Sequence, residues 1–238
     1  MFIVYAHRGA SEYAPENTLQ SFHLGVQLGA NGIETDVRRT KDGVLVLFHD
    51  PDLMRVCGVE GNVSDYTYQE LMEFTVKNEK TDTFDRIPTL EELLKYFGWR
   101  DLTFAIEIKD PDIEADVIAM LDKYNMKEKT VITAFEFPFI KRVKEIDSTY
   151  RVGHLVSKVT DEVISNLKSI GAEQICPIAT QGQLTPEKVQ EWHDMGFEVR
   201  AWGVTDIERM KRTYDCKTEG TTVNFPDLLI KYIAQKQK

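Results

Sequence analysis

The chain has 238 residues, of which 42% are hydrophobic, so it can bury the core of one large domain or of two small ones. Its formal net charge of -10 argues against a broad surface for nucleic acid or anionic membranes, because phosphate groups favour clustered cations. Cys57, Cys176 and Cys216 are scattered without a CxxC spacing, so neither a disulfide framework nor a zinc site is expected. No apolar run approaches the roughly 20 residues that cross a bilayer, and no signal peptide is recognisable, so we expect a soluble cytoplasmic protein.

The N-terminal third begins with strand and helix patterns and then becomes irregular. Residues 2–6 predict a buried parallel strand, residues 19–30 a helix, and residues 32–37 a second strand. A further apolar run occupies residues 44–48 and ends at a histidine. Residues 51–88 are polar and contain glycines, with little periodic pattern, which predicts an insertion that forms part of the wall of a site.

Regular alternation of strands and helices follows this insertion. Eight strands are predicted, beginning at Phe2, Gly32, Thr103, Thr130, Arg151, Gln174, Phe197 and Thr221. Because a helical pattern follows each one, the chain is predicted to be an α/β protein, a single (β/α)8 TIM barrel over residues 1–238 with a small insertion at 51–88 after the second barrel strand. An open doubly wound sheet is the alternative, and it is less favoured because no glycine-rich phosphate turn follows the first strand.

Acidic side chains gather at the ends of two predicted strands. Glu34 and Asp36 are two residues apart and therefore point to the same side of their strand, and Glu107 occupies the same kind of position in a later strand. In a barrel that side is the interior near the C-terminal mouth, where active sites form. Three buried carboxylates need positive partners, and oxygen ligands suit Mg2+ or Ca2+. We therefore predict that the three acids hold one divalent cation, with mutual salt bridges as the alternative.

Two histidines follow apolar runs at the same predicted mouth. His7 and His49 lie next to the acids in this arrangement, and histidine can both take and give a proton near neutral pH. The sequence therefore predicts an acid–base pair for cleavage of a phosphodiester. The residues do not show which histidine acts first, and we favour His49 as base and His7 as acid. Arg8 and Lys109 would bind the phosphate oxygens, by a planar fork and a compact charge respectively.

Other polar and aromatic residues near strand ends have weaker signals. Trp202 ends the seventh predicted strand and is a possible wall for a glycerol or alcohol group, although core packing would explain it as well. Asn17 precedes the first helix, where an amide commonly caps the backbone. Asp50 either orients His49 or begins the turn that follows it.

These motifs together resemble the glycerophosphodiester phosphodiesterase family. The resemblance rests on His7-Arg8-Gly9, Pro15-Glu16-Asn17-Thr18, Glu34-Thr35-Asp36, His49-Asp50, Glu107-Ile108-Lys109, Ala201-Trp202-Gly203-Val204 and Asn224-Phe225-Pro226-Asp227. It implies a metal-dependent barrel enzyme that hydrolyses small glycerophosphodiesters, such as glycerophosphocholine or glycerophosphoethanolamine, to glycerol 3-phosphate and an alcohol. It also implies attack by the glycerol 2-hydroxyl through a cyclic phosphate, a route that the residues alone do not distinguish from direct attack by water.

Two other functions are compatible with these candidate site residues. A lysophospholipase D would act on a substrate with one acyl chain, which needs an apolar lane that residues 51–88 supply only in scattered positions. A catalytically silent metal- or phosphate-binding barrel is disfavoured because both histidines are present. We expect a small-molecule substrate, no nucleic acid, no stable membrane association, and a monomer or homodimer.

Overall fold

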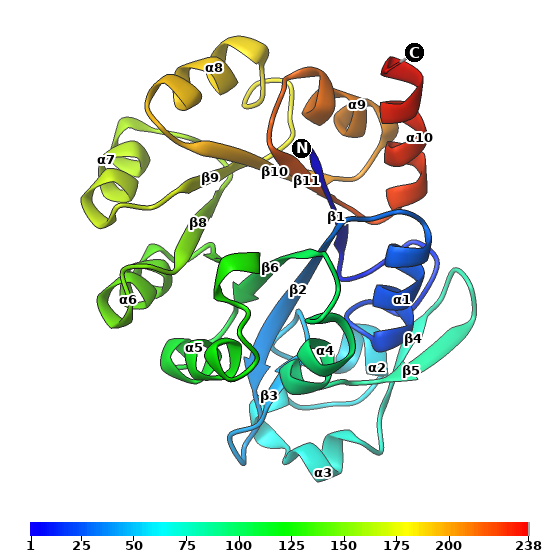
Figure 1. Ribbon diagram of the computed structural model, residues 1–238. Helices are drawn as coiled ribbons and strands as arrows, with labels where there is room; N and C mark the ends of the chain where they lie inside the picture. Colours follow the sequence, from blue (N-terminus) through cyan, green and yellow to red (C-terminus); the bar gives the residue numbers. More distant parts are fainter. Residues whose placement is uncertain (238) are drawn as a thin grey trace.

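Eight parallel strands close into a barrel, as the alternation of patterns predicts (Figure 1). The computed structural model describes residues 1–237. The barrel strands are β1 (Ile3–His7), β2 (Gly32–Arg39), β6 (Thr103–Ile108), β7 (Thr130–Ala134), β8 (Arg151–Val156), β9 (Gln174–Pro177), β10 (Glu198–Val204) and β11 (Gly220–Val223). β1 pairs in parallel with both β2 and β11, and this double pairing closes the sheet. The predicted (β/α)8 barrel is confirmed.

A helix follows each barrel strand and covers the outside of the barrel (Figure 1). These helices are α1 (Leu19–Gln27), α4 (Leu90–Phe97), α5 (Glu114–Lys123), α6 (Phe137–Ile146), α7 (Asp161–Ile170), α8 (Pro186–Asp194), α9 (Ile207–Asp215) and α10 (Pro226–Lys236). The short 3-10 turn η2 (Lys127–Lys129) precedes β7. Within residues 1–237, no helix combines the length and the apolar character that crossing a membrane requires.

Local sequence explains where α1 and α4 begin. Oγ1 of Thr18 accepts a hydrogen bond from the backbone NH of Ser21, and Oγ of Ser21 accepts one from the backbone NH of Thr18, so this capping box starts α1. Thr89 and Glu92 form the same box at α4. The buried face of α4 consists of Leu90, Leu93, Leu94 and Phe97. This spacing places all four side chains on one side of the helix, against the barrel.

The segment between β2 and α4 forms its own small unit beside the barrel (Figure 1). β3 (Leu45–Leu47) pairs antiparallel with the end of β2, and the segment then continues through α2 (Met54–Cys57), η1 (Val63–Asp65), α3 (Tyr68–Leu71), β4 (Thr75–Asn78) and β5 (Thr83–Arg86). β4 and β5 form an antiparallel hairpin that the sequence pattern does not predict.

This unit has a hydrophobic cluster separate from the main core between the barrel and its helices. The buried members of the second cluster are Val46, Phe48, Leu53, Val56, Val63, Leu71, Val76 and Ile87. Residues before and inside the insertion therefore pack together, which fixes the chain on both sides of His49.

Candidate active site

The first histidine is held at the C-terminal end of β1. His7 pairs across the sheet with Glu34 of β2, so regular main-chain pairing places it. Its Nδ1 lies 2.6 Å from Oδ1 of Asn224, directly after β11. Because that oxygen only accepts, Nδ1 carries the hydrogen and Nε2 is left with its lone pair, 3.9 Å from Oε2 of Glu34. Burial, and then Arg8, lower the pKa of His7 to about 4.

A tight turn follows His7 and directs Arg8 across the site. Arg8 has a φ of 54° and Gly9 a φ of 85°, both in the left-handed region. A Cβ on Gly9 would lie 2.2 Å from Oγ of Ser21, so only glycine fits at this position. The backbone NH of Arg8 donates to Glu34, which ties the turn to β2. Strained backbone of this kind is commonly found at functional sites.

The three predicted ligand carboxylates meet at the mouth of the barrel. Oxygens of Glu34, Asp36 and Glu107 all lie within 4.8 Å of one another, and the residues are 3%, 0% and 6% exposed. Burial, followed by the negative charge of Asp36, raises the pKa values of both glutamates. Such a set of crowded hard oxygen donors fits a divalent cation, which would keep all three carboxylates ionised.

Two cations share the Asp36 carboxylate. Arg8 Nε lies 3.1 Å from Oδ2 of Asp36, and Lys109 Nζ lies 3.2 Å from Oδ1, in ion pairs without hydrogen-bond geometry. Lys109 also pairs with Glu107. Although burial acts to raise the pKa of Asp36, Arg8 and then Lys109 outweigh it, so this pKa is lowered. Oδ1 of Asp36 is buried without a hydrogen bond, which leaves an oxygen available to a metal ion.

Asn17 holds the other side of Asp36. Its Nδ2 donates to Oδ2 of Asp36 at 2.9 Å, and its Oδ1 accepts from the hydroxyl of Thr35 at 2.7 Å. The expectation that Asn17 caps the first helix is therefore wrong, because Thr18 is the N-cap residue. Asn17 instead fixes the direction of a candidate metal ligand.

The second histidine is positioned mainly by side chains. His49 lies just beyond β3, and Arg38 donates to its carbonyl oxygen from Nε at 2.9 Å and from Nη2 at 2.8 Å. The same arginine pairs with Asp110. Nδ1 of His49 lies 2.6 Å from Oδ1 of Asp50, so Asp50 orients the ring, which is one of the two readings of the sequence. Burial lowers the pKa of His49, while Asp36 and Asp50 act to raise it.

A cavity of about 170 Å³ lies over these groups. Its lining comprises His7, Arg8, Glu34, His49, Glu107, Phe135, Leu155, Arg200, Trp202, Gly203 and Thr222. The Trp202 and Phe135 rings meet edge to face with centroids 4.8 Å apart, and Trp202 Nε1 donates to the Val156 carbonyl at 3.2 Å. A hollow of about 420 Å³ beside α4 and α5 lies elsewhere and contains neither histidine nor acid of this cluster.

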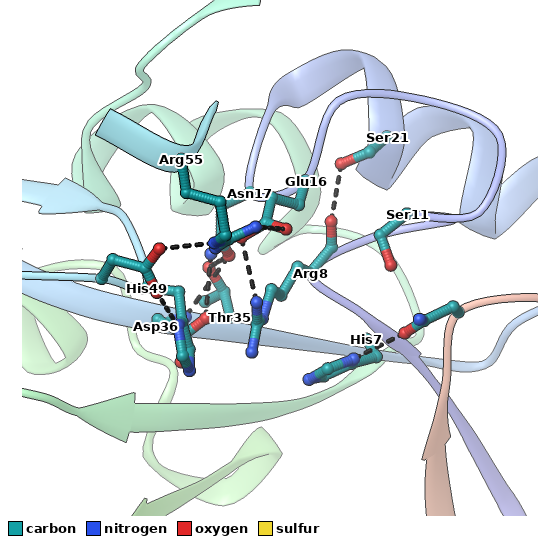
Figure 2. A network of polar contacts seen from close by, with 12 residues as sticks. His7, Arg8, Ser11, Glu16, Asn17, Ser21, Thr35, Asp36, His49 and Arg55 are labelled. Carbon is teal, nitrogen blue, oxygen red and sulfur yellow. Dashed lines mark hydrogen bonds and ion pairs between the residues drawn. The ribbon is translucent and has the colours of Figure 1, made fainter. Parts of the chain in front are cut away.

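All eight site residues predicted from the sequence thus lie around one barrel mouth, and Figure 2 shows Arg8 between His7 and His49. Arg38, Asn224 and Arg200 also lie at the site but were not predicted as site residues, although Asn224 belongs to one of the family motifs. Arg200 is 1% exposed, lies inside the barrel, and donates from Nε to Oε1 of Gln174 at 3.0 Å. Its position two residues before Trp202 is a signal for the same strand face, which could have identified it.

The chain is similar to known proteins in both sequence and fold. A model of the glycerophosphoryl diester phosphodiesterase family matches residues 7–228. The chain belongs to this family. It is therefore a phosphoric diester hydrolase, and a glycerophosphodiester phosphodiesterase from Caldanaerobacter subterraneus subsp. tengcongensis is 32% identical over 238 residues, covering 97% of each chain.

Two solved structures share the fold of this family member. A glycerophosphodiester phosphodiesterase from Agrobacterium tumefaciens has a TM-score of 0.83 at 24% identity, covering 97% of this chain and 100% of that one. An Oleispira antarctica phosphodiesterase in complex with the product sn-glycerol-3-phosphate has a TM-score of 0.84 at 24% identity, covering 98% of this chain and 96% of the other.

Proposed function

We propose that this enzyme uses a divalent cation to hydrolyse small glycerophosphodiesters, such as glycerophosphocholine or glycerophosphoethanolamine, to glycerol 3-phosphate and an alcohol. One observation carries the proposal: two histidines, each bonded through Nδ1, flank a cluster of three buried carboxylates. The glycerol 3-phosphate bound to the Oleispira antarctica relative supports the same product. The small cavity of about 170 Å³ favours a water-soluble substrate over a lysophospholipid.

Glu34, Asp36 and Glu107 are the proposed ligands of one Mg2+ or Ca2+ ion. Oδ1 of Asp36 accepts no hydrogen bond, although Lys109 Nζ lies 3.2 Å away. This oxygen and the raised pKa values of the two glutamates both favour a cation at this place. When bound, the ion supplies Lewis-acid stabilisation of charge on the phosphoryl oxygens and the nucleophile. Asn17 keeps the Asp36 carboxylate oriented toward the other two ligands.

The two histidines are the proposed acid–base pair, and their partners suggest an order. His7 has the neutral Asn224 as partner and a pKa lowered to about 4, so it is unprotonated at neutral pH and can accept a proton. His49 has the carboxylate of Asp50 as partner, which stabilises the imidazolium. We therefore assign His7 as base and His49 as acid in the first step, the reverse of the order favoured by the sequence.

The proposed reaction runs in two steps. The glycerol 2-hydroxyl attacks phosphorus as His7 takes its proton, and the P–O bond to the alcohol breaks as His49 protonates the leaving oxygen. In the second step, water opens the resulting cyclic phosphate while the two histidines exchange roles, which gives glycerol 3-phosphate. Arg8 and Lys109 bind the nonbridging phosphate oxygens, and Trp202 contacts the apolar side of the glycerol or alcohol.

The wider setting follows from the same proposal. We propose a cytoplasmic monomer or homodimer that turns over free glycerophosphodiesters in lipid and glycerol metabolism. Residues 51–88 belong to the single catalytic domain and border bound substrate next to His49.

A panel of glycerophosphodiesters and lysophospholipids tests this function. Purified protein is treated with a chelator, each cation is added back in turn, and release of glycerol 3-phosphate is measured by a coupled enzymatic assay. We expect release from glycerophosphodiesters that stops with chelator and returns with Mg2+ or Ca2+. Unchanged activity in chelator contradicts the metal role, and turnover of lysophospholipids alone contradicts the substrate class.

A further inference from the structure

An arginine of the insertion lies behind the site and joins two of its acids. Arg55, in α2, reaches Glu16 with two bonds, Nη1 to Oε2 at 2.9 Å and Nη2 to Oε1 at 2.7 Å. Its Nε reaches Oδ2 of Asp50 at 2.5 Å. Figure 2 shows the guanidinium between the His49 side and the Glu16 side of the network. Among residues 1–237, no other side chain pairs with both acids.

Each of these acids leads directly to a group at the centre of the site. Asp50 uses its second oxygen, Oδ1, to hold Nδ1 of His49 at 2.6 Å. Glu16 holds Nη1 of Arg8 at 2.9 Å, and Arg8 reaches Asp36. An unbroken series of charged contacts therefore runs from His49 to a candidate metal ligand, and Arg55 is its central member.

Packing within the insertion determines where Arg55 lies. Its neighbours Leu53 and Val56 are buried in the second hydrophobic cluster, at 0% and 8% exposure. Asn78 of β4 donates to the carbonyl oxygens of Ser11 and Ala14 at 3.0 and 2.9 Å, which ties the hairpin to the loop that carries Glu16. The insertion is thus attached to the β1–α1 loop on two sides, and Arg55 is placed by a core of its own.

The contacts of Arg55 orient the carboxylates of Asp50 and Glu16 and contribute little to the folding stability of the protein. Its side chain is 46% exposed, and exposed ion pairs contribute little to folding because water and salt screen them. A guanidinium fork nevertheless fixes the plane of a carboxylate that it binds with two N–H groups. Without Arg55, Asp50 could rotate away from His49, and Glu16 would retain only Arg8 among these partners.

We infer that Arg55 is a positioning residue for the proposed reaction, and that it holds Asp50 against His49 and Glu16 against Arg8. The inference rests on the proposed function for its kinetic consequence. Its structural part, the orientation of the His49 ring by way of Asp50, stands independently of any substrate.

Arg55→Met tests the kinetic consequence, with Arg86→Met as a matched control. Arg86 is also in the insertion, is 40% exposed, and pairs with Glu92 through two nitrogens, and within residues 1–237 no hydrogen bond or ion pair joins its side chain to a residue of the site. We expect Arg55→Met to lower kcat by about 10- to 100-fold, the usual loss when a supporting contact of an active group is removed. Arg86→Met should remain within about threefold of wild type, and Arg55→Lys should recover part of the loss.

A double-mutant cycle shows whether the effect passes through Asp50. If it does, Arg55→Met combined with Asp50→Asn should lower kcat little more than Asp50→Asn alone. Independent losses that multiply would overturn the part of the inference that passes through Asp50 and His49. Equal kcat values for Arg55→Met and Arg86→Met at unchanged thermal stability would overturn the whole inference.

An NMR measurement decides the structural part without any turnover. In wild type, the His49 Nδ1 proton bonded to Asp50 should give a downfield signal, assigned by its loss in His49→Gln. This signal should shift or broaden in Arg55→Met and persist in Arg86→Met. A signal unchanged in Arg55→Met overturns the inference even if the enzyme is active. If wild type releases no glycerol 3-phosphate, the proposed function fails, while the signal still decides whether Arg55 positions His49.

Discussion

His7 and His49 face the same cavity, but the molecule positions them in different ways. His7 is part of the closed barrel, and its place follows from the pairing of β1 with β2 and β11. His49 lies beyond the short strand β3, and the side chains of Arg38 and Asp50 hold its carbonyl and its ring. The barrel thus supplies one member of the pair directly, while the other depends on side chains that can be changed one at a time.

Their partners also differ in charge. Asn224 orients His7 through a neutral amide oxygen, which acts to raise the pKa of His7 but adds no counter-charge, whereas the Asp50 carboxylate supplies His49 with a negative partner. The two rings therefore differ in how strongly their partners stabilise a positive charge, although burial lowers the pKa of both histidines. Substitutions at the two histidines or at their partners should therefore change activity, stability and the pH profile in ways that differ between the two residues.

Removal of either ring should have the largest effect. His7→Ala or His49→Ala should lower kcat by roughly 10² to 10⁴ while cation binding, measured by calorimetry, persists. The two variants should differ with an aryl phosphodiester, whose leaving group needs no proton. That substrate should restore much of the rate to His49→Ala but not to His7→Ala. The opposite pattern would reverse the assigned roles.

Asp50→Asn removes the difference in charge by giving both histidines a neutral partner. We expect kcat to fall by about 10- to 100-fold, because the imidazolium of His49 loses its counter-charge and its orientation. Steady-state kinetics with Asp52→Asn as control measure this. Asp52 is a neighbouring acid whose side chain, within residues 1–237, accepts one hydrogen bond, from the backbone NH of Met54. Equal rates for the two variants would mean that Asp50 merely begins the turn.

Arg38→Met tests whether side chains place the His49 backbone. The carbonyl of His49 would lose its two donors, and Asp110 would lose its cation. We expect a loss of about 1–3 kcal/mol in the free energy of unfolding, and a smaller loss of kcat than in Asp50→Asn. Urea titration followed by circular dichroism measures the first quantity. A variant with full stability and full activity would show that β3 alone positions His49.

Asn224→Asp gives both histidines an anionic partner. The added carboxylate should raise the pKa of His7 from about 4, so the rate should begin to fall at higher pH when the solution is acidified. The base must be neutral to accept a proton, and protonation would therefore occur closer to neutral pH. The acid limb of the kcat/KM profile measures this shift. If the acid limb of the profile does not move, protonation of His7 is not what lowers the rate at acid pH.

Strand positions and strand-end chemistry were predictable from the sequence, because continuous apolar runs mark the buried strands and alternate residues share a face. Contacts that depend on closure of the barrel were not predictable from the sequence. His7 and Asn224 are far apart in sequence and meet only because β11 pairs with β1. The β4–β5 hairpin escaped prediction since both strands are short and largely polar, and β5 has no buried residue.

Asn17 illustrates a second limit of sequence reasoning. An Asn-Thr pair before a helix suits either residue as a cap, and the local pattern cannot show which one is used. In the structure, Thr18 takes the cap and Asn17 turns toward Asp36. The choice depends on a strand that comes later in the chain.

The second hydrophobic cluster gives the insertion a core of its own, and we predict that the insertion and the barrel unfold as separate units. The insertion can open locally while the barrel stays closed, because its apolar side chains pack mainly on one another. Arg55 and the residues just before His49, Val46 and Phe48, belong to that unit. Activity should therefore be lost at a lower urea concentration than the secondary structure of the barrel. Hydrogen exchange should accordingly be faster at Val76 than at Ile106. Coincident loss of activity and circular dichroism would instead indicate a single transition. If so, substitutions in the insertion would change the urea concentration at which activity is lost, and substitutions in the barrel core would change the concentration at which the barrel unfolds.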